Sequence, residues 1–135
     1  MPMTVDEVAR FALTLEGVEG GVRWNHQTFA VGDKSVCWVR PFSKADLQRF
    51  GDAPPPRGDI LAITVEDLDA KEAILAMGLR GFFTIAHFDG YPAVLVALRE
   101  ARAAEVKAVI EQAWRYRRAE AAAPAKRPRR RPAGR

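Results

Sequence analysis

The sequence predicts an α+β fold over residues 1–118, with an antiparallel sheet covered by helices. Three observations carry this prediction: apolar residues recur at helical spacing near both ends of the domain, β-prone runs separated by turn residues lie between them, and apolar periodicity stops after Arg118. A chain of 135 residues, 48% of them hydrophobic, has the size for one compact core. Residues 119–135 are rich in Ala, Pro, Lys and Arg, so we expect a disordered basic tail there.

The domain is expected to begin with a helix followed by a hairpin. Thr4 and Glu7 have the spacing of a capping box, and apolar residues then recur at i, i+3, i+4 and i+7: Val8, Phe11, Ala12 and Leu15. The runs 28–31 and 35–40 are β-prone, and a glycine-containing turn at 32–34 joins them. A short helix over about 43–50 and a proline-rich loop up to Gly58 are predicted next.

Strands and helices alternate in the second half of the domain. Residues 60–65 predict a buried strand, and Asp67 is placed to cap a helix that ends near Gly78. The apolar face of that helix is expected to consist of Ala70, Ala73, Ile74 and Met77. The runs 82–85 and 93–98 flank Asp89-Gly90, a strong hairpin signal, and predict an antiparallel pair.

The last helix has the clearest pattern of the chain. One face is apolar and is expected to pack on the core: Val106, Val109, Ile110, Ala113 and Trp114. Lys107, Glu111 and Arg115 follow one another at i, i+4 on another face, which is expected to be solvated.

The positive charge of the chain belongs to the tail. The whole sequence carries 21 Lys and Arg and 17 Asp and Glu, a formal charge of +4, whereas residues 1–118 hold 15 basic and 16 acidic residues, a net charge of −1. Six basic residues lie in the tail: Lys126, Arg127, Arg129, Arg130, Arg131 and Arg135. Cationic side chains on a flexible segment bind phosphates of any duplex or RNA by releasing counterions. We therefore expect DNA or RNA as the partner, mostly without sequence specificity.

Residues 126–132, Lys-Arg-Pro-Arg-Arg-Arg-Pro, resemble the AT-hook of minor-groove-binding proteins, whose core is Pro-Arg-Gly-Arg-Pro. Arg130 stands where that motif has glycine, and its side chain hinders close approach of the backbone to the floor of the groove. The resemblance favours DNA without predicting A·T selectivity. The alternative is a solubilising tail with no fixed partner.

A further resemblance covers most of residues 4–118. The segment 83–98, Phe-Thr-Ile-Ala-His-Phe-Asp-Gly-Tyr-Pro-Ala-Val-Leu-Val-Ala-Leu, followed by Glu105 and by Ala113-Trp114-Arg115, resembles the MmcQ/YjbR family in order and spacing. The family often has proline where this chain has Ala86. The resemblance implies a CyaY/frataxin-like fold, described in bacterial members as a double wing, and a DNA-binding role. It transfers no catalytic residues.

A second candidate surface gathers aromatic and polar residues of the two predicted hairpins. Its members are Trp24, His26, Trp38, Arg40, His87, Asp89 and Tyr91. Aromatic faces with arginines nearby suit nucleobases or a small ligand, while strands also bury aromatic residues such as Phe29 in cores. His87 and Asp89 could form a metal or acid/base site with His26 or Cys37. The alternative is that Asp89 closes its turn and His87 bonds a neighbouring loop.

Several function classes receive no support from the sequence. Cys37 is the single cysteine, which excludes an intrachain disulfide and a cysteine-built zinc site. No glycine-rich phosphate loop or nucleophile elbow is present, so we predict no catalytic residue, metal or cofactor. No apolar run approaches the roughly 20 residues that span a bilayer, and we expect a cytoplasmic protein without a membrane partner. Nucleic-acid binding is the first hypothesis, and a small-molecule or peptide-binding module is the alternative.

Overall fold

Six strands form one antiparallel sheet in the computed structural model, which describes residues 3–23, 26–40, 58–85 and 88–122. The strands are β1 (Val18–Arg23), β2 (His26–Val31), β3 (Lys34–Val39), β4 (Ile60–Thr64), β5 (Phe82–Phe83) and β6 (Ala93–Ala97). Their order across the sheet is β1-β2-β3-β4-β6-β5, and all neighbours run antiparallel. The predicted α+β class is confirmed.

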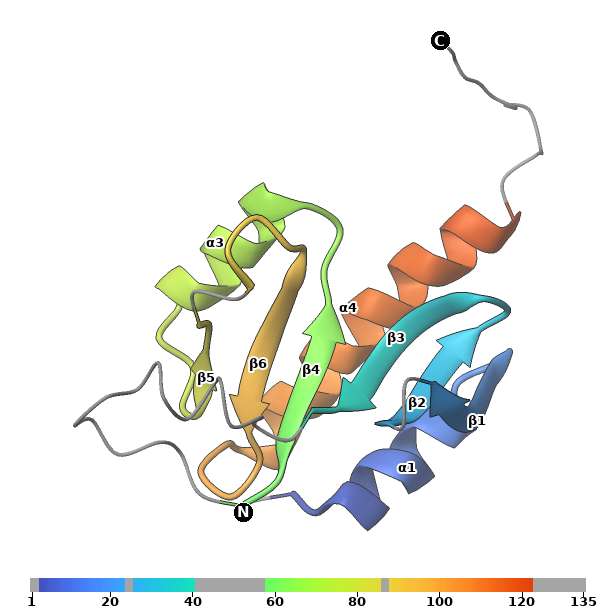
Figure 1. Ribbon diagram of the computed structural model, residues 1–135, viewed down its shortest axis with the longest axis horizontal. Coiled ribbons are helices and arrows are strands. Elements are labelled where there is room, and N and C mark those ends of the chain that lie inside the picture. The colour runs from blue at the N-terminus through green and yellow to red at the C-terminus, as the bar shows by residue number, and fades with distance from the viewer. Residues whose placement is uncertain (1–2, 24–25, 41–57, 86–87, 123–135) are drawn as a thin grey trace, which may run out of the picture.

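Within the described part of the chain, three helices accompany the sheet: α1 (Val5–Thr14), α3 (Leu68–Ala76) and α4 (Ala103–Ala122). In Figure 1, α4 crosses behind the strands, α1 lies near β1 and β2, and α3 lies at the β6 end of the sheet. The main core lies between these helices and the sheet and includes Phe29, Leu61, Ile63, Val96 and Ile110. The sheet therefore has one face turned to α1 and α4, and we call the opposite side the second face.

The two central strands are apolar on both sides. All five residues of β4 and all five of β6 are buried. Leu61 and Ile63 contribute to the main core, whereas Ile60, Ala62 and Leu95 belong to a smaller apolar cluster on the second face. Burial on both faces explains why these segments are continuous apolar runs in the sequence. On the second face, the buried side chains of β4 and β6 form a packed apolar base.

The start of α1 confirms the predicted capping box. The Glu7 backbone N–H donates to Thr4 Oγ1 at 3.1 Å, and the Thr4 N–H donates to Glu7 Oε1 at 2.9 Å. Val8 and Ala12 are fully buried, as the helical spacing predicts. At the other end of the domain, Trp114 packs against the core and its indole N–H donates to the Glu16 carbonyl oxygen at 2.8 Å.

Two features differ from the sequence prediction. Strand β1 was not predicted, because Gly20 and Gly21 weaken its β signal and its residues after Val18 are mostly exposed at the sheet edge. Met77, which follows the last residue of α3, was expected on the apolar face of that helix and is 67% exposed, while Lys71 of α3 is only 6% exposed. The Lys71 side chain is buried because its ammonium finds backbone carbonyl partners, described below.

The last helix continues past Arg118 to Ala122. Two bonds within the helix hold its final turn: the Glu120 carboxylate accepts from Arg117 Nη1 at 2.9 Å and from the Tyr116 hydroxyl at 3.2 Å. The predicted helix at 43–50 and the proline-rich segment up to residue 57 lie outside the described residues. Of the helices in the described ranges, none has the length and apolar character needed to cross a bilayer.

Candidate functional site

Three residues of the predicted surface lie on the second face, in or next to strands β2 and β3: His26, Trp38 and Arg40. Thr28 of β2 is paired with Trp38 of β3 in the strand register. Trp38 packs against the apolar cluster of the second face, whereas the adjacent Cys37 is buried in the main core. Because side chains alternate along a strand, His26 shares the face of Thr28, and Arg40 shares the face of Trp38.

The turn before β6 adds two aromatic rings to this face. Phe88 is buried, while Tyr91 is 48% exposed. The Tyr91 ring makes edge-to-face contacts with Phe88, at 5.5 Å between centroids and 77°, and with Trp38, at 6.4 Å and 80°. These three rings come from two separate parts of the chain, and their T-shaped packing fixes the turn against β3.

Lys71 of α3 holds the same turn from the other side. Its ammonium donates to the carbonyl oxygen of Phe88 at 2.6 Å and to that of Tyr91 at 2.9 Å. Burial lowers the pKa of Lys71, and the negative charge of Asp89 opposes this effect. Gly90 takes a φ of 77°, a conformation that glycine adopts without steric cost. The positions of the Phe88 and Tyr91 rings therefore depend on one buried cation.

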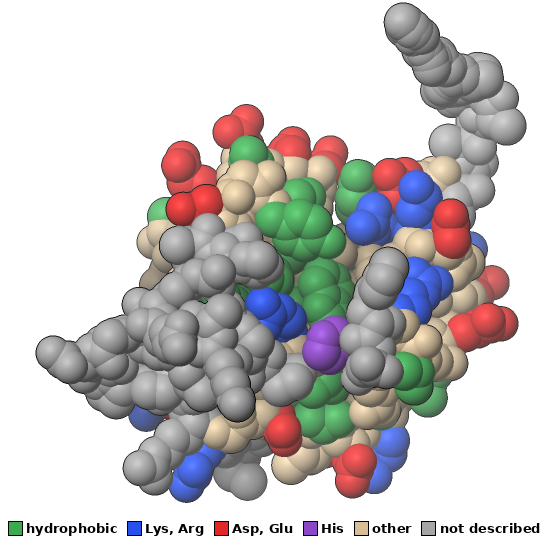
Figure 2. All heavy atoms as spheres, viewed as in Figure 1, with side chains coloured by type: hydrophobic (Ala, Val, Ile, Leu, Met, Phe, Trp, Pro, Cys, Tyr) green, Lys and Arg blue, Asp and Glu red, His purple; other side chains and the backbone are tan. Residues whose placement is uncertain are grey.

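These residues surround a concavity that we call the hairpin hollow. It is lined by His26, Trp38, Arg40, Phe88 and Tyr91 and has a volume of about 260 Å³. A second concavity of about 170 Å³ shares His26, Trp38 and Tyr91 and adds Arg23, Thr28 and Ser35. Figure 2 shows this side of the molecule, where hydrophobic side chains gather near the centre with a histidine and Lys or Arg side chains among them.

Arg40 of the hollow and Arg23 of the adjoining concavity have different roles. The Arg40 guanidinium lies 5.3 Å from the centroid of the Phe88 ring, a cation–π geometry. Arg23 instead donates to the carbonyl oxygens of Asp33 at 2.9 Å and Gly32 at 3.0 Å, which ties it to the β2–β3 turn. The hollow thus combines aromatic walls with cationic charge, a combination that suits a planar ring carrying negative charge.

The predicted surface is only partly assembled. His26, Trp38, Arg40 and Tyr91 lie together in the hollow, whereas Trp24 and His87 lie outside the described residues, as do the six cationic residues of the tail. Asp89 is exposed, and its carboxylate makes no hydrogen bond to another described residue. Within the described residues, Lys71 and the positive φ of Gly90 hold this turn, and closure of the turn by Asp89 stays a prediction.

Two residues of the site were missed by sequence reasoning. Phe88 forms part of the wall, and Lys71 positions the turn, although it lies on a helix that was predicted to bury only apolar residues. The signal for Phe88 was its place beside Asp89-Gly90 in the apolar segment. No local pattern marks Lys71, since its partners lie 17 and 20 residues away. Phe29 of β2 is buried in the main core and does not belong to the hollow.

A metal or thiol site receives no support from the described part of the chain. No group of three or more His, Cys, Asp or Glu side chains there is placed to hold a metal ion. Cys37 is fully buried in the main core, and burial raises the pKa of its thiol to about 12. It is therefore a packing residue and does not reach the hollow, where a nucleophile or ligand would need to lie.

The fold is similar to that of a protein from Pseudomonas syringae whose crystal structure was solved by the Northeast Structural Genomics Consortium. The TM-score is 0.65, the sequences are 15% identical, and the likeness covers 85% of this chain and 99% of that one. At this level of identity the likeness concerns the fold alone.

The chain matches no protein-family model. It is 40% identical over 116 residues to "Uncharacterized protein Rv2570" of Mycobacterium tuberculosis and to "Uncharacterized protein Mb2600" of Mycobacterium bovis. Each alignment covers 82% of this chain and 85% of the relative, so it spans most of the folded domain. By this similarity the chain belongs to the same family as these mycobacterial proteins.

Proposed function

We propose that the protein is a non-enzymatic nucleic-acid-binding protein of the cytoplasm, in which the basic tail supplies most of the affinity and the hairpin hollow receives an unpaired base. One observation carries the division of labour. Four arginines of the last helical region are each paired with a carboxylate: Arg102 with Glu105, Arg115 with Glu111, Arg117 with Glu120 and Arg118 with Glu16. These pairs reduce the domain's attraction for phosphates, whereas residues 123–135, which follow α4, hold six cations and no acidic residue.

The hollow supports a role for single strands. Tyr91 and Trp38 offer ring surface to a base, and Arg40 lies beside them to face a phosphate or a base edge. Stacking on an aromatic side chain contributes about 1–3 kcal/mol per base and tolerates any sequence. The resemblance to the MmcQ/YjbR family points to the same function, and membership of that family stays a prediction.

The tail is tested by neutralising its cations in the full chain. The variant replaces all six by glutamine at once: K126Q, R127Q, R129Q, R130Q, R131Q and R135Q. Fluorescence anisotropy with a labelled 20-mer duplex of mixed sequence, from 50 to 200 mM salt, should give a slope of log K against log salt of about −5 for the parent, if all six cations bind phosphates. The slope should approach zero in the variant.

A control variant neutralises three exposed cations of the domain, Lys34, Arg80 and Arg99, and should keep most of the slope. Equal affinity of parent and tail variant would overturn the proposal.

The hollow is tested separately with a single-stranded oligonucleotide. Tyr91→Ala should weaken single-strand binding about tenfold with little effect on duplex binding, because only an unpaired base can enter the hollow. Leu13→Ala is a matched control, since Leu13 is 53% exposed on α1, away from the hollow. Equal losses for both variants, or none for Tyr91→Ala, would remove the hollow from the proposal.

A second candidate function is the binding of a small molecule or peptide in the hollow. The observation that favours it is the shape, since a concavity of about 260 Å³ with an adjoining one of about 170 Å³ can enclose a single planar ring with an acidic substituent. Mononucleotides and aromatic carboxylates should then raise the melting temperature of the parent and leave that of Tyr91→Ala unchanged. Stabilisation by such a compound without single-strand binding would favour this candidate over the first.

A further inference from the structure

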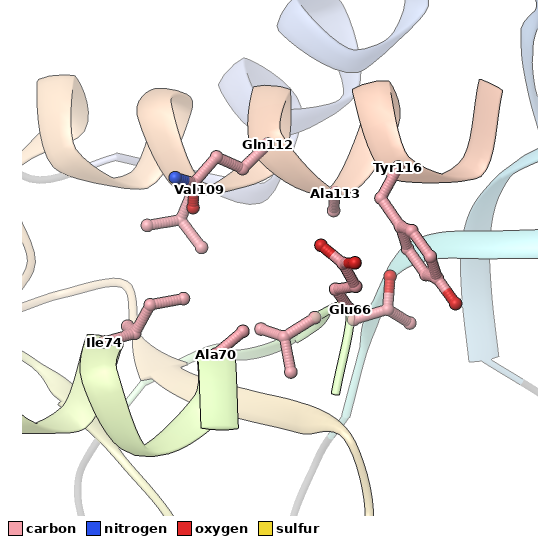
Figure 3. A pocket seen from close by; sticks show the side chains of 9 residues that line it. Glu66, Ala70, Ile74, Val109, Gln112, Ala113 and Tyr116 are labelled. Atoms are coloured by element: carbon pink, nitrogen blue, oxygen red, sulfur yellow. The ribbon is translucent and has the colours of Figure 1, made fainter. Parts of the chain in front are cut away.

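Another concave feature lies on the other side of the domain, between α3 and α4. Two hollows of about 170 and 410 Å³ share Ala70, Ile74, Val109 and Gln112 and so form one continuous feature, which we call the interhelix groove. In Figure 3, Ile74 and Ala70 of α3 face Val109, Gln112 and Ala113 of α4 across an open space. The lining consists mostly of small and branched apolar side chains, with the polar Gln112 where the two hollows meet and a glutamate in each hollow.

The ends of the groove are acidic. Glu66 lies at one end beside Tyr116, and its carboxylate points into the space between the helices (Figure 3). Glu105 of the first turn of α4 lines the other hollow. Residues 66–79 contain four acidic residues and one cation, a net charge of −3, and that cation is Lys71, whose ammonium is bound to the turn of the second face. The groove is thus an apolar channel with negative charge at both ends.

This negative charge is poorly compensated within the described residues. Glu66 and Asp69 form no ion pair or hydrogen bond with another described residue. Glu105 has one oxygen 3.9 Å from Arg102, while its other oxygen, Oε1, is buried without a hydrogen-bond partner in the described chain. Burial raises the pKa of the Tyr116 phenol, and the charge and hydrogen bond of Glu120 raise it further, while Arg117 lowers it and Glu66 adds the smallest increase. A buried acceptor without a donor calls for a cationic or N–H partner.

We propose that residues 123–135 of the same molecule occupy the interhelix groove. Their lysine and arginine side chains would meet Glu66 and Glu105, which line the groove, and Asp69, which precedes the groove-lining Ala70. Charge complementarity is the first argument, since residues 123–135 hold six cations and no acidic residue. The composition also fits, because Ala and Pro are small enough for a floor lined by Ala70, Ala73 and Ala108. A second copy of the domain would instead bring another acidic groove rim into the contact.

The length of the tail is the second argument. Tyr116 lies six residues before the end of α4, about 9 Å along the helix axis, and Glu105 lies about 26 Å before it. A chain that turns back at Ala122 reaches about 13 Å by Lys126 and about 30 Å by Arg131 when extended. The cationic run therefore covers the span between the two acidic ends. Attachment to α4 gives the tail a high effective concentration at the groove.

The consequence rests on the proposed function. If the same cations bind nucleic acid and the groove, nucleic acid must displace the tail before it binds. The groove then lowers the affinity of the full chain for weak, non-specific sites, and acidic residues that never touch nucleic acid control its binding. The contact of tail and groove is measurable without nucleic acid, so the two ideas can fail independently.

The direct test uses a nitroxide spin label in the full chain. Cys37 is fully buried, so an Ala133→Cys variant can be labelled at the tail with the native thiol protected. Paramagnetic broadening at low salt should appear at amides of the groove, such as Ala73 and Val109, and be absent at Val22 of β1. It should disappear at 0.5 M salt, because screening weakens contacts between exposed charges. Uniform or absent broadening of the groove amides would overturn the proposal.

Two controls identify the occupant. In a mixture of labelled chains without isotope and isotope-enriched chains without label, broadening would show docking in trans, by a second copy, and would overturn the intramolecular contact. The variant E66Q/D69N/E105Q should abolish broadening, whereas D6N/E19Q/E100Q, which removes the same charge from exposed positions elsewhere, should retain it. Asp67 is left intact because its carboxylate caps α3 by accepting from the Ala70 N–H at 2.8 Å.

The competition is measured with the duplex used above. E66Q/D69N/E105Q should bind it about fivefold more tightly than the parent at low salt, and D6N/E19Q/E100Q should bind with a smaller gain. In a chain whose six tail cations are replaced by glutamine, the groove substitutions should give no larger gain than D6N/E19Q/E100Q gives. If the groove amides are broadened but the protein binds no nucleic acid, the contact between tail and groove is supported. Only the proposed function is then overturned. Equal gains for the two charge variants would overturn the competition.

Discussion

The ammonium of Lys71 lies 2.6 Å from the carbonyl oxygen of Phe88, and this contact joins the only buried cation of the described residues to the wall of the hairpin hollow. The same ammonium donates to Tyr91 O at 2.9 Å, so two backbone acceptors of one turn share one donor group. Their side chains form two of the three rings of the hollow. Lys71 is therefore a positioning residue: it touches no ligand-facing surface itself, but it sets the place of the rings that do.

Lys71→Met is expected to lower the free energy of unfolding by about 1–3 kcal/mol, because the methionine keeps the volume but removes two charge-assisted hydrogen bonds. The carbonyl oxygens of Phe88 and Tyr91 then keep only the backbone N–H donors of Tyr91 and Ala93. Urea denaturation measures this loss. Lys34→Met is the control, since Lys34 is exposed in β3, and its effect should stay within about 0.5 kcal/mol. NMR shifts at residues 88–91 should change in the Lys71 variant alone. Similar stability of the two variants would contradict the role given to Lys71.

The stability of the protein should fall in alkaline solution because of Cys37. Burial raises the pKa of this thiol to about 12 from its usual 9.0. Above pH 9 the unfolded chain loses the thiol proton and the native chain keeps it, so the unfolded state binds fewer protons and stability decreases as pH rises toward 12. The limiting slope is about 1.4 kcal/mol per pH unit. Lys71 acts in the opposite direction, because its lowered pKa leaves more protons on the unfolded state in the alkaline range.

A comparison with Cys37→Ala isolates the thiol from Lys71 and from other groups. The parent should be more stable than the variant at pH 8, because the thiol fills the core, and this advantage should shrink as pH rises above 9. Urea titrations at pH 8, 9 and 10 measure the difference. If the difference in free energy of unfolding between the two proteins does not change with pH, burial does not raise the pKa of the Cys37 thiol.

The sequence was sufficient for elements whose signals are local. The capping box of Thr4 and Glu7, the apolar face of α4 and the strand pairs around Asp89-Gly90 all depend on residues within a few positions of one another, and the structure confirms them. Strand β1 was not predicted, because its glycines give no local β signal and because it is stabilised by pairing with β2.

The candidate site was only partly predictable, because its assembly depends on contacts between residues far apart in the sequence. Its residue types, aromatic and cationic, could be read from two hairpins, but their meeting depends on the sheet order β3-β4-β6, which brings Trp38 near Tyr91. Lys71 has no local signature at all. A lysine on a helix is usually solvated, and only the distant carbonyl oxygens of Phe88 and Tyr91 make its burial favourable.

Gly81 is predicted to be irreplaceable on steric grounds. It has a φ of +82°, and a Cβ atom at this position would lie 2.8 Å from the Ala97 carbonyl oxygen and 3.0 Å from the Ala101 nitrogen. Its own carbonyl oxygen accepts from the Ala97 N–H at 2.8 Å, so the backbone cannot move away without losing that bond. Gly81→Ala should lower the free energy of unfolding by about 2–4 kcal/mol, from the unfavourable φ and the contact with backbone atoms.

Gly21→Ala is the matched control for Gly81→Ala. Gly21 lies in β1, has no positive φ, and a Cβ atom there would meet nothing within 4 Å. An alanine in a strand loses less backbone entropy on folding than a glycine, so this variant should be as stable as the parent or slightly more so. Thermal and urea denaturation of both variants decide the matter, and equal losses would mean that the conformation of Gly81 is not the cause.

The end of α4 determines where the tail can be removed without damaging the domain. Arg117 Nε donates to the Ser35 carbonyl oxygen at 2.8 Å, and its Nη1 pairs with Glu120 at 2.9 Å, so the last turn of the helix supports a contact with β3. A chain ending at Ala122 should match the stability of the full chain within about 0.5 kcal/mol. A chain ending at Arg118 should lose about 1 kcal/mol, because it removes the carboxylate that Arg117 and Tyr116 share and frays the helix end.

Urea denaturation of the two truncated chains and of Glu120→Gln in the full chain separates the causes. The glutamine keeps the helix and a hydrogen-bond acceptor but removes the charge, so its stability should fall between those of the two truncations. If the chains ending at Arg118 and Ala122 are equally stable, the Glu120 contacts contribute nothing. If they differ as expected, nucleic-acid binding by a chain ending at Arg118 would combine loss of the tail with loosening of the β3 side of the hairpin hollow. Only the cut after Ala122 would then measure the tail alone.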